Sequence, residues 1–461
     1  MKKALCWVRR DLRLHDHAAL SQALQENDEV QLVFVFDPLI LDKLSDKQDR
    51  RVTFILQSLQ DMERTLQKRG ASLLVRYGDP VKEIPALARE LGASSVYANR
   101  DYEPYAKKRD SQVLEQLSAH GIGFKQFKDS VIFEQAEVRN GSGAIYKVFT
   151  PYKNKWLEVL NEQGGLVPEF KMNANRIAKR ENAESVLKVD WHKKIGFVET
   201  PAELTGGTSE ALARLKGFEA RMAHYHERRD IPSIDGTSNL SPYIRHGCLS
   251  VRDMVRAALE QKGDGARVWL SEVVWRDFYH MILDTHPYVE HSSFKPEYDQ
   301  IQWRGKDEWF KAWCEGETGY PVVDAAMRCL NQTGMMHNRL RMVVASFLCK
   351  TLLIDWRRGE RYFAEKLLDF DLAANSGGWQ WSSSSGCDAQ PYFRIFNPYN
   401  QSEKFDPDGN YIRDWIPELA HLDAKSIHAP EPLLAPDYPR PIVSYEKMRK
   451  EALEMYGILK K

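Results

Sequence analysis

The sequence ALCWV at residues 4–8 is the first of five short apolar runs that decide the fold of the first part of the chain. The runs continue with VQLVFVF at 30–36, SLLVRY at 72–77, SVYANR at 95–100 and GFKQFK at 123–128. Between the second and third runs, apolar residues recur at helical spacing and a glycine follows as a stop signal: Val52, Ile55, Leu56, Leu59, Met62, Leu66 and Gly70. Strands alternating with helices predict a doubly wound α/β domain with a parallel sheet over residues 1–130.

The turn after the first predicted strand reads RRDLRLHDH at 9–17 and contains no glycine. A conventional NAD site needs a glycine-rich turn there, so the sequence argues against one. Neither G-x-x-x-x-G-K-[ST] nor H-E-x-x-H occurs in the chain. The sequence therefore offers no support for a nucleotide hydrolase or a zinc peptidase.

The rest of the chain differs from this first domain. Residues 131–204 carry mixed signals and are interpreted as an interdomain connector. From about residue 205 strand signals end, and helical patterns such as Leu340, Val343, Val344, Phe347 and Leu348 predict an all-α domain over 205–461. Nine of the twelve tryptophans lie in this helical domain.

Composition limits the class of protein. The 461 residues include 65 basic and 65 acidic side chains, so any site for a polyanion must be a local patch. No apolar run approaches the ~18 residues of a membrane span, and charge interrupts the start MKKALCWVRR. The six cysteines form no C-x-x-C pair, so we expect reduced cysteines, no metal site and a cytoplasmic protein.

The stretch DGTSNLSPYIRHG at 235–247 has two interpretations. Ser241 followed by Pro242 is typical of an N-cap and a first helical position, which predicts only a helix start. Alternatively, the hydroxyls of Thr237, Ser238 and Ser241 lie beside the free N–H groups of a helix and suit a pyrophosphate.

The segment LLDFDLAANSGGWQWSSSSG at 367–386 is also open to two interpretations. Asp369, Asp371 and Asn375 offer hydrogen bonds to a polar ring or chain, and Gly377-Gly378 would allow a flat ring to approach the backbone. The alternative is a capped turn between helices.

The segment WLSEVVWRDFYH at 269–280 predicts a helix with one polar and aromatic face. Glu272, Trp275, Arg276 and Tyr279 are spaced i, i+3, i+4 and i+7, so they share that face. A carboxylate, an indole and a guanidinium together suit a flat polar ligand such as a nucleobase.

These and other motifs together resemble the cryptochrome/photolyase family over nearly the whole chain, and within it the DNA photolyases. The matching motifs are WVRRDLRLHDHAAL at 7–20, YKVFTPYKNKW at 146–156, GTSNLSPYIRHGCLS at 236–250, WRDFYH at 275–280, TGYPVVDAAMR at 318–328, MHNRLRM at 336–342 and DLAANSGGWQWSSSSGCDAQPYFRIFNP at 371–398. The resemblance implies an α/β antenna domain, a connector and a helical domain that holds FAD.

The resemblance also assigns roles to individual residues. It implies FAD contacts at Tyr225, Thr237, Ser238, Asn239, Leu240, Ser241, Trp269, Glu272, Arg276, Asn338, Arg341, Asp369, Asp371 and Asn375. It implies DNA contacts at Arg229, Glu272, Trp275, Tyr279, Asn338, Arg339, Trp381 and Gln401, with Trp275 and Trp381 enclosing a flipped-out lesion. The residues expected at the reaction centre are Glu272, Trp275, Asn338, Met342, Asn375 and Trp381.

The activity implied by the resemblance is the light-dependent splitting of cyclobutane pyrimidine dimers in UV-damaged DNA, by an electron from excited reduced FAD. Photolyases of (6-4) photoproducts carry two histidines where this chain has Asn338 and Met342, so dimers are the expected substrate. A blue-light cryptochrome without repair activity is the main alternative. Asn375 argues against it, because cryptochromes typically carry aspartate or cysteine there. The expected protein is a monomer.

Two further features follow from the resemblance. Trp379, Trp356 and Trp303 match a chain of indoles that conducts electrons to the flavin. The N-terminal domain of the family can hold a second, antenna chromophore. Tyr105 and Ala106 stand where folate-binding relatives carry Asn-Glu, so a deazaflavin or second flavin is expected, and folate less so, near Phe36, Asp37, Arg51, Asp101 and Glu103. The alternative is an empty crevice with solvated charges.

Overall fold

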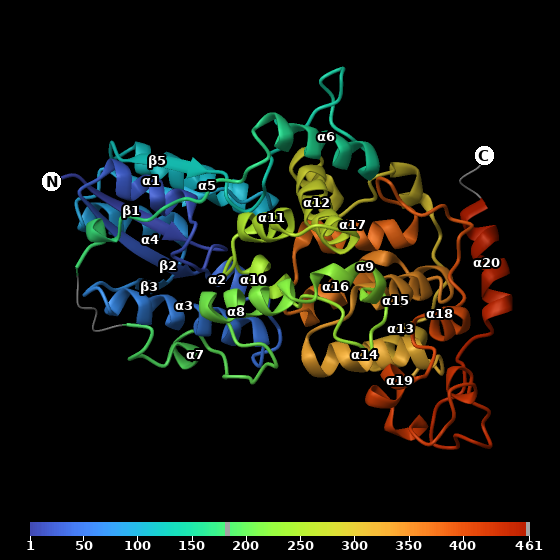
Figure 1. The fold of residues 1–461 in the computed structure, drawn as a ribbon. Helices are drawn as coiled ribbons and strands as arrows, with labels where there is room; N and C mark the ends of the chain where they lie inside the picture. The colour runs from blue at the N-terminus through green and yellow to red at the C-terminus, as the bar shows by residue number, and fades with distance from the viewer. Residues whose placement is uncertain (180–184, 458–461) are drawn as a thin grey trace. The chain divides into compact units, whose positions relative to one another are not determined.

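The computed structural model describes residues 1–179 and 185–457, and its chain divides into two compact units (Figure 1). The first unit comprises residues 1–145, 153–223 and 238–284, and the second comprises 146–152, 224–237 and 285–461. Residues 180–184 of the predicted connector and residues 458–461 of the predicted helical domain lie outside the described residues. The boundaries at residues 130 and 204 remain predictions.

The first unit contains a five-stranded parallel sheet in the order β3-β2-β1-β4-β5. The strands are β1 (Lys3–Val8), β2 (Glu29–Phe36), β3 (Leu74–Tyr77), β4 (Ser95–Asn99) and β5 (Gly123–Phe127). Each falls on one of the five apolar runs, so the predicted parallel sheet is confirmed. In this order the chain changes direction of winding between β1 and β4, and open sheets bind ligands beyond the carboxyl ends of the strands near such a point.

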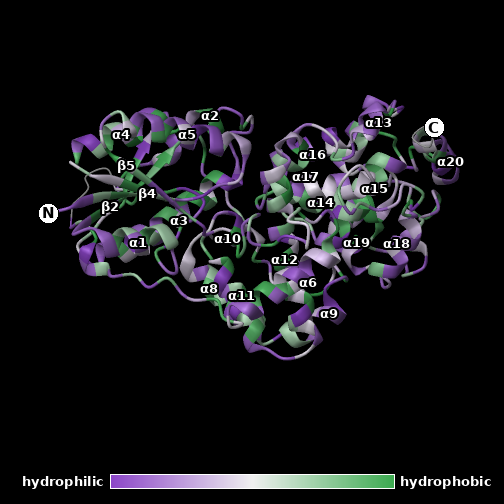
Figure 2. Ribbon diagram, turned by 90° about the horizontal axis from the view of Figure 1, so that it is seen from above, coloured by the Kyte–Doolittle hydropathy of each residue, from purple (hydrophilic) through white to green (hydrophobic). Residues whose placement is uncertain are grey.

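The first unit contains helices that cover the two faces of the sheet and helices that do not. They are α1 (Ala18–Glu26), α2 (Pro38–Leu41), α3 (Arg50–Gln67), α4 (Pro80–Glu90), α5 (Pro104–Ser118), α7 (Trp191–Lys194), α8 (Thr208–Glu219), α10 (Ser241–Arg245), α11 (Val251–Glu260), α12 (Asp264–Thr285) and most of α6 (Phe149–Glu162). Figure 2 shows α4 and α5 on one face and α1 and α3 on the other, with apolar strands between them. The helix predicted from Val52 to Leu66 is α3. Asp49 caps it, and Val52 and Leu66 are among its buried residues.

The second unit is helical, and its described residues contain no strand. Its helices are α9 (Tyr225–Arg228), α13 (Asp307–Glu315), α14 (Pro321–Thr333), α15 (Asn338–Lys350), α16 (Trp356–Lys366), α17 (Leu372–Ser383), α18 (Pro398–Phe405), α19 (Asn410–Trp415) and α20 (Tyr445–Gly457). Short 3₁₀ turns occur in the second unit at Pro287–Glu290, Pro296–Gln300, Pro417–Leu419 and Ser426–His428, in the first unit at Ala174–Arg176, and at the boundary at Met222–His224. The predicted helical character is confirmed.

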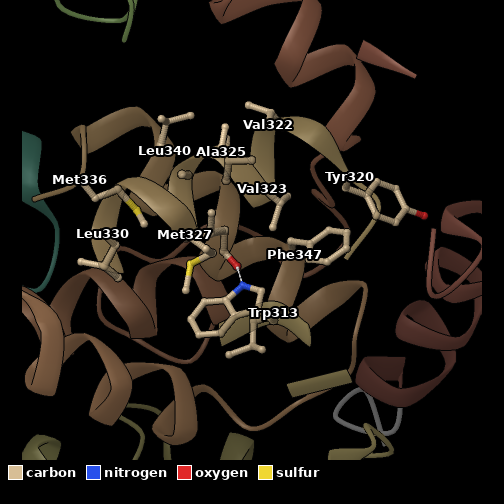
Figure 3. Packing of buried hydrophobic residues seen from close by; sticks show 14 of the residues in the cluster. Trp313, Tyr320, Val322, Val323, Ala325, Met327, Leu330, Met336, Leu340 and Phe347 are labelled. Atoms are coloured by element: carbon tan, nitrogen blue, oxygen red, sulfur yellow. Dashed lines mark hydrogen bonds between the residues drawn. The ribbon is translucent and has the colours of Figure 1, made fainter. Parts of the chain in front are cut away.

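A large apolar cluster holds the helices of the second unit together (Figure 3). Trp313 lies in it fully buried, and its Nε1 donates to the carbonyl of Val344 at 3.2 Å. A buried indole is more stable where its N–H finds an acceptor, and here the backbone of α15 supplies one. The cluster therefore fixes α15 relative to α13 and gives α15, α16 and α17 a rigid base.

All six cysteines are unpaired thiols, as expected. A search of the described helices finds none that combines the length and the apolar character of a membrane span.

Candidate flavin and DNA site

The predicted flavin contacts are divided between the two units. The second unit carries Tyr225, Thr237, Asn338, Arg341, Asp369, Asp371 and Asn375, and the first carries Ser238, Asn239, Leu240, Ser241, Trp269, Glu272 and Arg276. We describe each set within its own unit.

The acidic residues of the second unit lie at the start of α17. Asp371 caps this helix by accepting from the backbone N–H of Ala374 at 3.2 Å. Asp369 is buried, and both its oxygens accept from Nη2 of Arg341, at 2.8 and 3.1 Å. Hydrogen bonds between two charged groups are stronger than those between neutral ones, so this pair fixes the Asp369 side chain. The structure thus brings together Arg341, Asp369 and Asp371, and the segment is both a capped helix start and a cluster of polar groups.

Asn375 is oriented by a residue that the sequence analysis did not identify. Its Nδ2 donates to Oε1 of Glu360 at 2.8 Å and to the carbonyl of Glu360 at 3.1 Å. Burial raises the pKa of Glu360, while the hydrogen bond from Asn375 lowers it. Because Nδ2 is used in this way, Oδ1 is the atom that Asn375 presents as an acceptor to other groups.

Two of the three predicted electron-transfer indoles are buried on adjacent helices. Trp356 is the first residue of α16, and Trp379 lies in α17 with its ring 5.0 Å from that of Phe363. Gly359 permits this packing, because a Cβ at that position would lie 2.1 Å from the ring of Trp379. Trp303 is half-buried and lies edge-on to Tyr456 with ring centroids 6.2 Å apart.

Replacing Gly359 with alanine is therefore expected to separate α16 from α17. The added methyl group overlaps a buried ring in a close-packed core, which costs about 1–3 kcal/mol of stability. Gly217→Ala, in α8, is the matched control, because a Cβ there has no atom within 4 Å and alanine favours a helix. Thermal unfolding should show a clear decrease for Gly359→Ala alone; equal unfolding temperatures would contradict the packing described.

The first turns of α15 carry Asn338 and Met342, which stand where photolyases of (6-4) photoproducts have two histidines. His337 precedes the helix, and its Nδ1 accepts from the N–H of Arg339 at 3.2 Å. Burial lowers the pKa of His337 to about 4, so the ring is neutral at pH 7. Asn338 is exposed, and Met342 lies with its Sδ 3.8 Å from Nη1 of Arg339. No protonated imidazole is available at this helix start near neutral pH.

The remaining predicted DNA contacts of the second unit are partly exposed. The guanidinium of Arg229 lies over the ring of Tyr225 at 5.2 Å, and Nη2 of Arg339 donates to Asp230 at 2.9 Å. Trp381 in α17 and Gln401 in α18 are half-buried. Each side chain therefore has an accessible part.

The flavin segment of the first unit differs from the prediction at one residue. Ser241 is not the N-cap but the first residue of the five-residue helix α10, and Leu240 occupies the cap position without a side-chain hydrogen bond. The preceding Asn239 has φ of 52°, a conformation that asparagine tolerates better than most residues. The backbone therefore turns sharply before the helix, and the hydroxyl of Ser241 does not cap it.

The four residues predicted to share one face of α12 lie on a half-buried stripe, and its role as a ligand face remains a prediction. Glu272, Trp275, Arg276 and Tyr279 are partly exposed, whereas Val273, Val274, Asp277 and Phe278 are buried. The rings of Trp275 and Tyr279 stack with centroids 5.4 Å apart and planes 30° from parallel. Arg276 donates to the carbonyl of Ser130. Trp269, one turn earlier, is buried against Phe218.

Asp277 anchors α12 from the opposite side. One of its oxygens accepts from the backbone N–H groups of Ile132 and Phe133 and from Nε1 of Trp156, at 3.0, 3.3 and 3.0 Å. Complete burial outweighs these hydrogen bonds and raises the pKa of Asp277 to about 6. The folded protein therefore binds a proton at this carboxyl more tightly than the unfolded chain.

Asp277 should make stability fall as the pH rises from about 4 to about 6. A carboxyl with a raised pKa favours the folded state below its unfolded pKa of about 3.9, and this gain, on the order of 2–3 kcal/mol, is lost as pH passes the folded value. Asp277→Asn removes the titration. Denaturant unfolding across this range should be flatter for the variant than for the wild type; equal slopes would contradict the raised pKa.

The predicted antenna residues form two clusters at the carboxyl ends of the strands. Asp37, directly after β2, accepts from the hydroxyl of Tyr105 at 2.5 Å. Asp101 and Glu103, after β4, accept from Nη1 of Arg10 at 3.4 and 2.6 Å. Burial would raise the pKa of Asp101, but Arg10 and Arg9 hold it below its usual value.

The other two predicted antenna residues have separate contacts. The ring of Phe36 stacks on that of Trp191 with centroids 5.7 Å apart, and Arg51 pairs with Asp49 through two nitrogens. The charges of this region are thus paired within the unit, which differs from the alternative of solvated charges.

A parallel α/β unit and a helical unit that carries buried acids, indoles and arginines agree with the fold that the resemblance to the cryptochrome/photolyase family implies. The family described as DNA photolyase matches residues 4–171, and the FAD-binding domain of DNA photolyase matches residues 269–457. The deoxyribodipyrimidine photo-lyase of Vibrio cholerae is 40% identical over 99% of both chains. The chain therefore belongs to the DNA photolyase family.

Two solved structures of the family are similar over the whole chain. A cryptochrome from Synechocystis superposes with a TM-score of 0.88 at 30% identity, covering 99% of both chains. An archaeal photolyase from Sulfolobus tokodaii, which contains two FAD molecules, superposes with a TM-score of 0.84 at 34% identity and covers 99% of this chain and all of the other. The fold and the FAD-binding domain are thus shared with both.

The residues present fit a bound FAD. Buried polar groups cluster at Asp369, Asp371 and Asn375, and Nε1 of Trp379 is buried with no acceptor among the described residues. The Cβ position of Gly378 is open, so a ring can approach the backbone of α17 there. Acidic and amide acceptors beside oxidisable indoles suit the polar chain and ring of a flavin.

Proposed function

We propose that the chain is a lyase that splits cyclobutane pyrimidine dimers in UV-damaged DNA in a light-dependent reaction. The observation that carries the proposal is the relationship to the Vibrio cholerae deoxyribodipyrimidine photo-lyase across nearly the full length of both chains. The Asn375 amide, where cryptochromes typically differ, supports the same activity.

Bound reduced FAD would supply the light-driven electron for the reaction. Arg341, Asp369, Asp371 and Asn375 would hold the cofactor from the second unit, with Oδ1 of Asn375 directed by Glu360 as an acceptor. In the first unit Trp275 would offer a stacking surface and Glu272 a polar contact to an extruded base. In the second unit Trp381 and Asn338 would offer the same two kinds of contact.

Dimers rather than (6-4) photoproducts are the proposed substrate. The neutral, helix-capping His337 and the residues Asn338 and Met342 provide no general acid for the proton transfer that (6-4) repair requires. The test is illumination of the reduced protein with two oligonucleotides, each containing one defined lesion. Only the oligonucleotide that contains the dimer should be repaired. Light-dependent repair of the (6-4) oligonucleotide would contradict this assignment.

A blue-light cryptochrome is the second candidate, favoured by the similarity to the Synechocystis cryptochrome. A cryptochrome would bind flavin and undergo photoreduction but would not split dimers, so the same experiment separates the two functions. The cytoplasmic location and the monomeric state remain predictions from the sequence.

The antenna chromophore is proposed to be a deazaflavin or a second flavin. The Sulfolobus photolyase with two FAD molecules supports this class, as do the apolar wall of Phe36 and Trp191 and the Asp37–Tyr105 pair. Arg10 is already paired with Asp101 and Glu103, which leaves less positive charge for the acidic tail of a folate. Reconstitution with each chromophore, measured by energy transfer to FAD, tests this; efficient transfer from folate would contradict it.

A further inference from the structure

Arg339, the second residue of α15, is paired with a carboxylate beside a predicted phosphate contact. Its Nη2 donates to Oδ1 of Asp230 at 2.9 Å, and Asp230 directly follows Arg229 in the chain. The guanidinium lies over the ring of Phe405, 4.4 Å from the centroid. All of these residues belong to the second unit. One cation proposed to bind DNA is therefore held by an internal anion.

Arg339 is less completely bonded than other paired arginines of the same unit. Arg341 donates to both oxygens of Asp369, and Arg328 donates to both oxygens of Glu418 at 2.8 and 2.9 Å. Arg339 has a single carboxylate oxygen as acceptor, and its Nη1 has only the thioether sulfur of Met342 at 3.8 Å. A guanidinium has five N–H donors, so Arg339 retains donors for a second anion.

We propose that Asp230 competes with the DNA phosphate for Arg339 and thereby limits how strongly the protein binds any DNA backbone. The inference rests on the proposed function, which makes DNA the partner. The side chains of Arg339 and Asp230 are 21% and 37% exposed, so a phosphate can reach the pair. With one charge of each sign, the pair contributes almost no net attraction to a polyanion.

The competition should affect damaged and undamaged DNA equally. Phosphate contacts are independent of sequence, whereas lesion recognition depends on the stacking indoles and on base contacts. Phe405 supports the guanidinium through its ring whether or not Asp230 is charged, because a cation–π contact does not involve the carboxylate. Removing the carboxylate charge should therefore leave Arg339 in place and make it available to a phosphate.

The test measures dark binding of Asp230→Asn to a dimer-containing oligonucleotide and to the same oligonucleotide without the lesion, over a range of salt concentrations. Both affinities should rise about fivefold at low salt, and the slope of log affinity against log salt should steepen by about 0.9, as for one additional phosphate contact. The ratio of the two affinities should stay unchanged.

Asp307→Asn is the matched control, because Asp307 pairs with Arg358 at 2.7 Å in the same unit and its loss changes net charge equally. It should leave both the affinity and the slope unchanged. In an Arg339→Gln background Asp230→Asn should no longer steepen the slope, because the guanidinium that it would release is absent. Thermal unfolding verifies folding, and Asp230→Ser serves as a second neutral variant if Asp230→Asn unfolds.

Several results would overturn the proposal. Unchanged or weaker DNA binding by a folded Asp230→Asn would show that the carboxylate positions Arg339 and does not compete. An equal rise in Asp307→Asn would show a general charge effect. If the wild-type protein binds neither oligonucleotide, the proposed function itself fails, which is distinguishable because the wild type is measured in the same series.

Discussion

Replacing Trp356 with phenylalanine is expected to abolish the reduction of oxidised FAD by light while leaving repair by the chemically reduced protein nearly unchanged. Trp356 is buried at the start of α16, next to the helix that carries Trp379. Phenylalanine is much harder to oxidise than an indole, so it interrupts a chain of short electron steps. Nε1 of Trp356 has no acceptor among the described residues, so the substitution leaves no bonded partner unsatisfied.

The matched control is Trp415→Phe. Trp415 is a half-buried indole in α19 that packs against Tyr411 at 6.3 Å and is outside the predicted chain. Absorption of the flavin is followed under blue light with an external reductant. Undiminished photoreduction in Trp356→Phe would show that another route conducts the electron, and loss of repair by the reduced variant would show a structural defect.

Replacing Trp275 with alanine is expected to weaken binding of dimer-containing DNA about 10- to 100-fold, because stacking of a base on an aromatic ring contributes about 1–3 kcal/mol. Undamaged DNA, whose bases stay stacked, should bind almost as before. Trp275 is accessible on the half-buried stripe of α12, and Tyr279 stacks on it from one side.

Trp275→Phe provides the control for this prediction, since a phenyl ring retains a stacking surface. It should recover most of the lost affinity in a dark binding assay. Equal losses for damaged and undamaged DNA would show that Trp275 supports α12 and does not read the lesion.

The features that the sequence predicted are those with a local pattern. The five strands follow from short apolar runs, and α3 and the stripe on α12 follow from a period of 3.6 residues, which neighbouring residues alone determine. The cluster at the start of α17 was visible because Asp369, Asp371 and Asn375 lie within seven residues of one another.

The features that the sequence could not predict depend on contacts between distant segments. Glu360 reaches Asn375 because α16 packs on α17, and that packing requires the small Gly359. Asp230 and Arg339 are 109 positions apart. The prediction that Ser241 is an N-cap was wrong, because the motif Ser-Pro also fits a helix in which the serine is the first residue. Burial decides the pKa of Asp277, and no local pattern encodes it.

We expect this chain to split pyrimidine dimers by using light, and one measurement tests this most directly. UV-irradiated DNA is incubated with the purified, reduced holoprotein, and thymine dimers are counted after blue light and after an equal time in the dark. The account predicts loss of dimers in the light and none in the dark. A flavin-containing protein that leaves the dimer count unchanged in the light would contradict it.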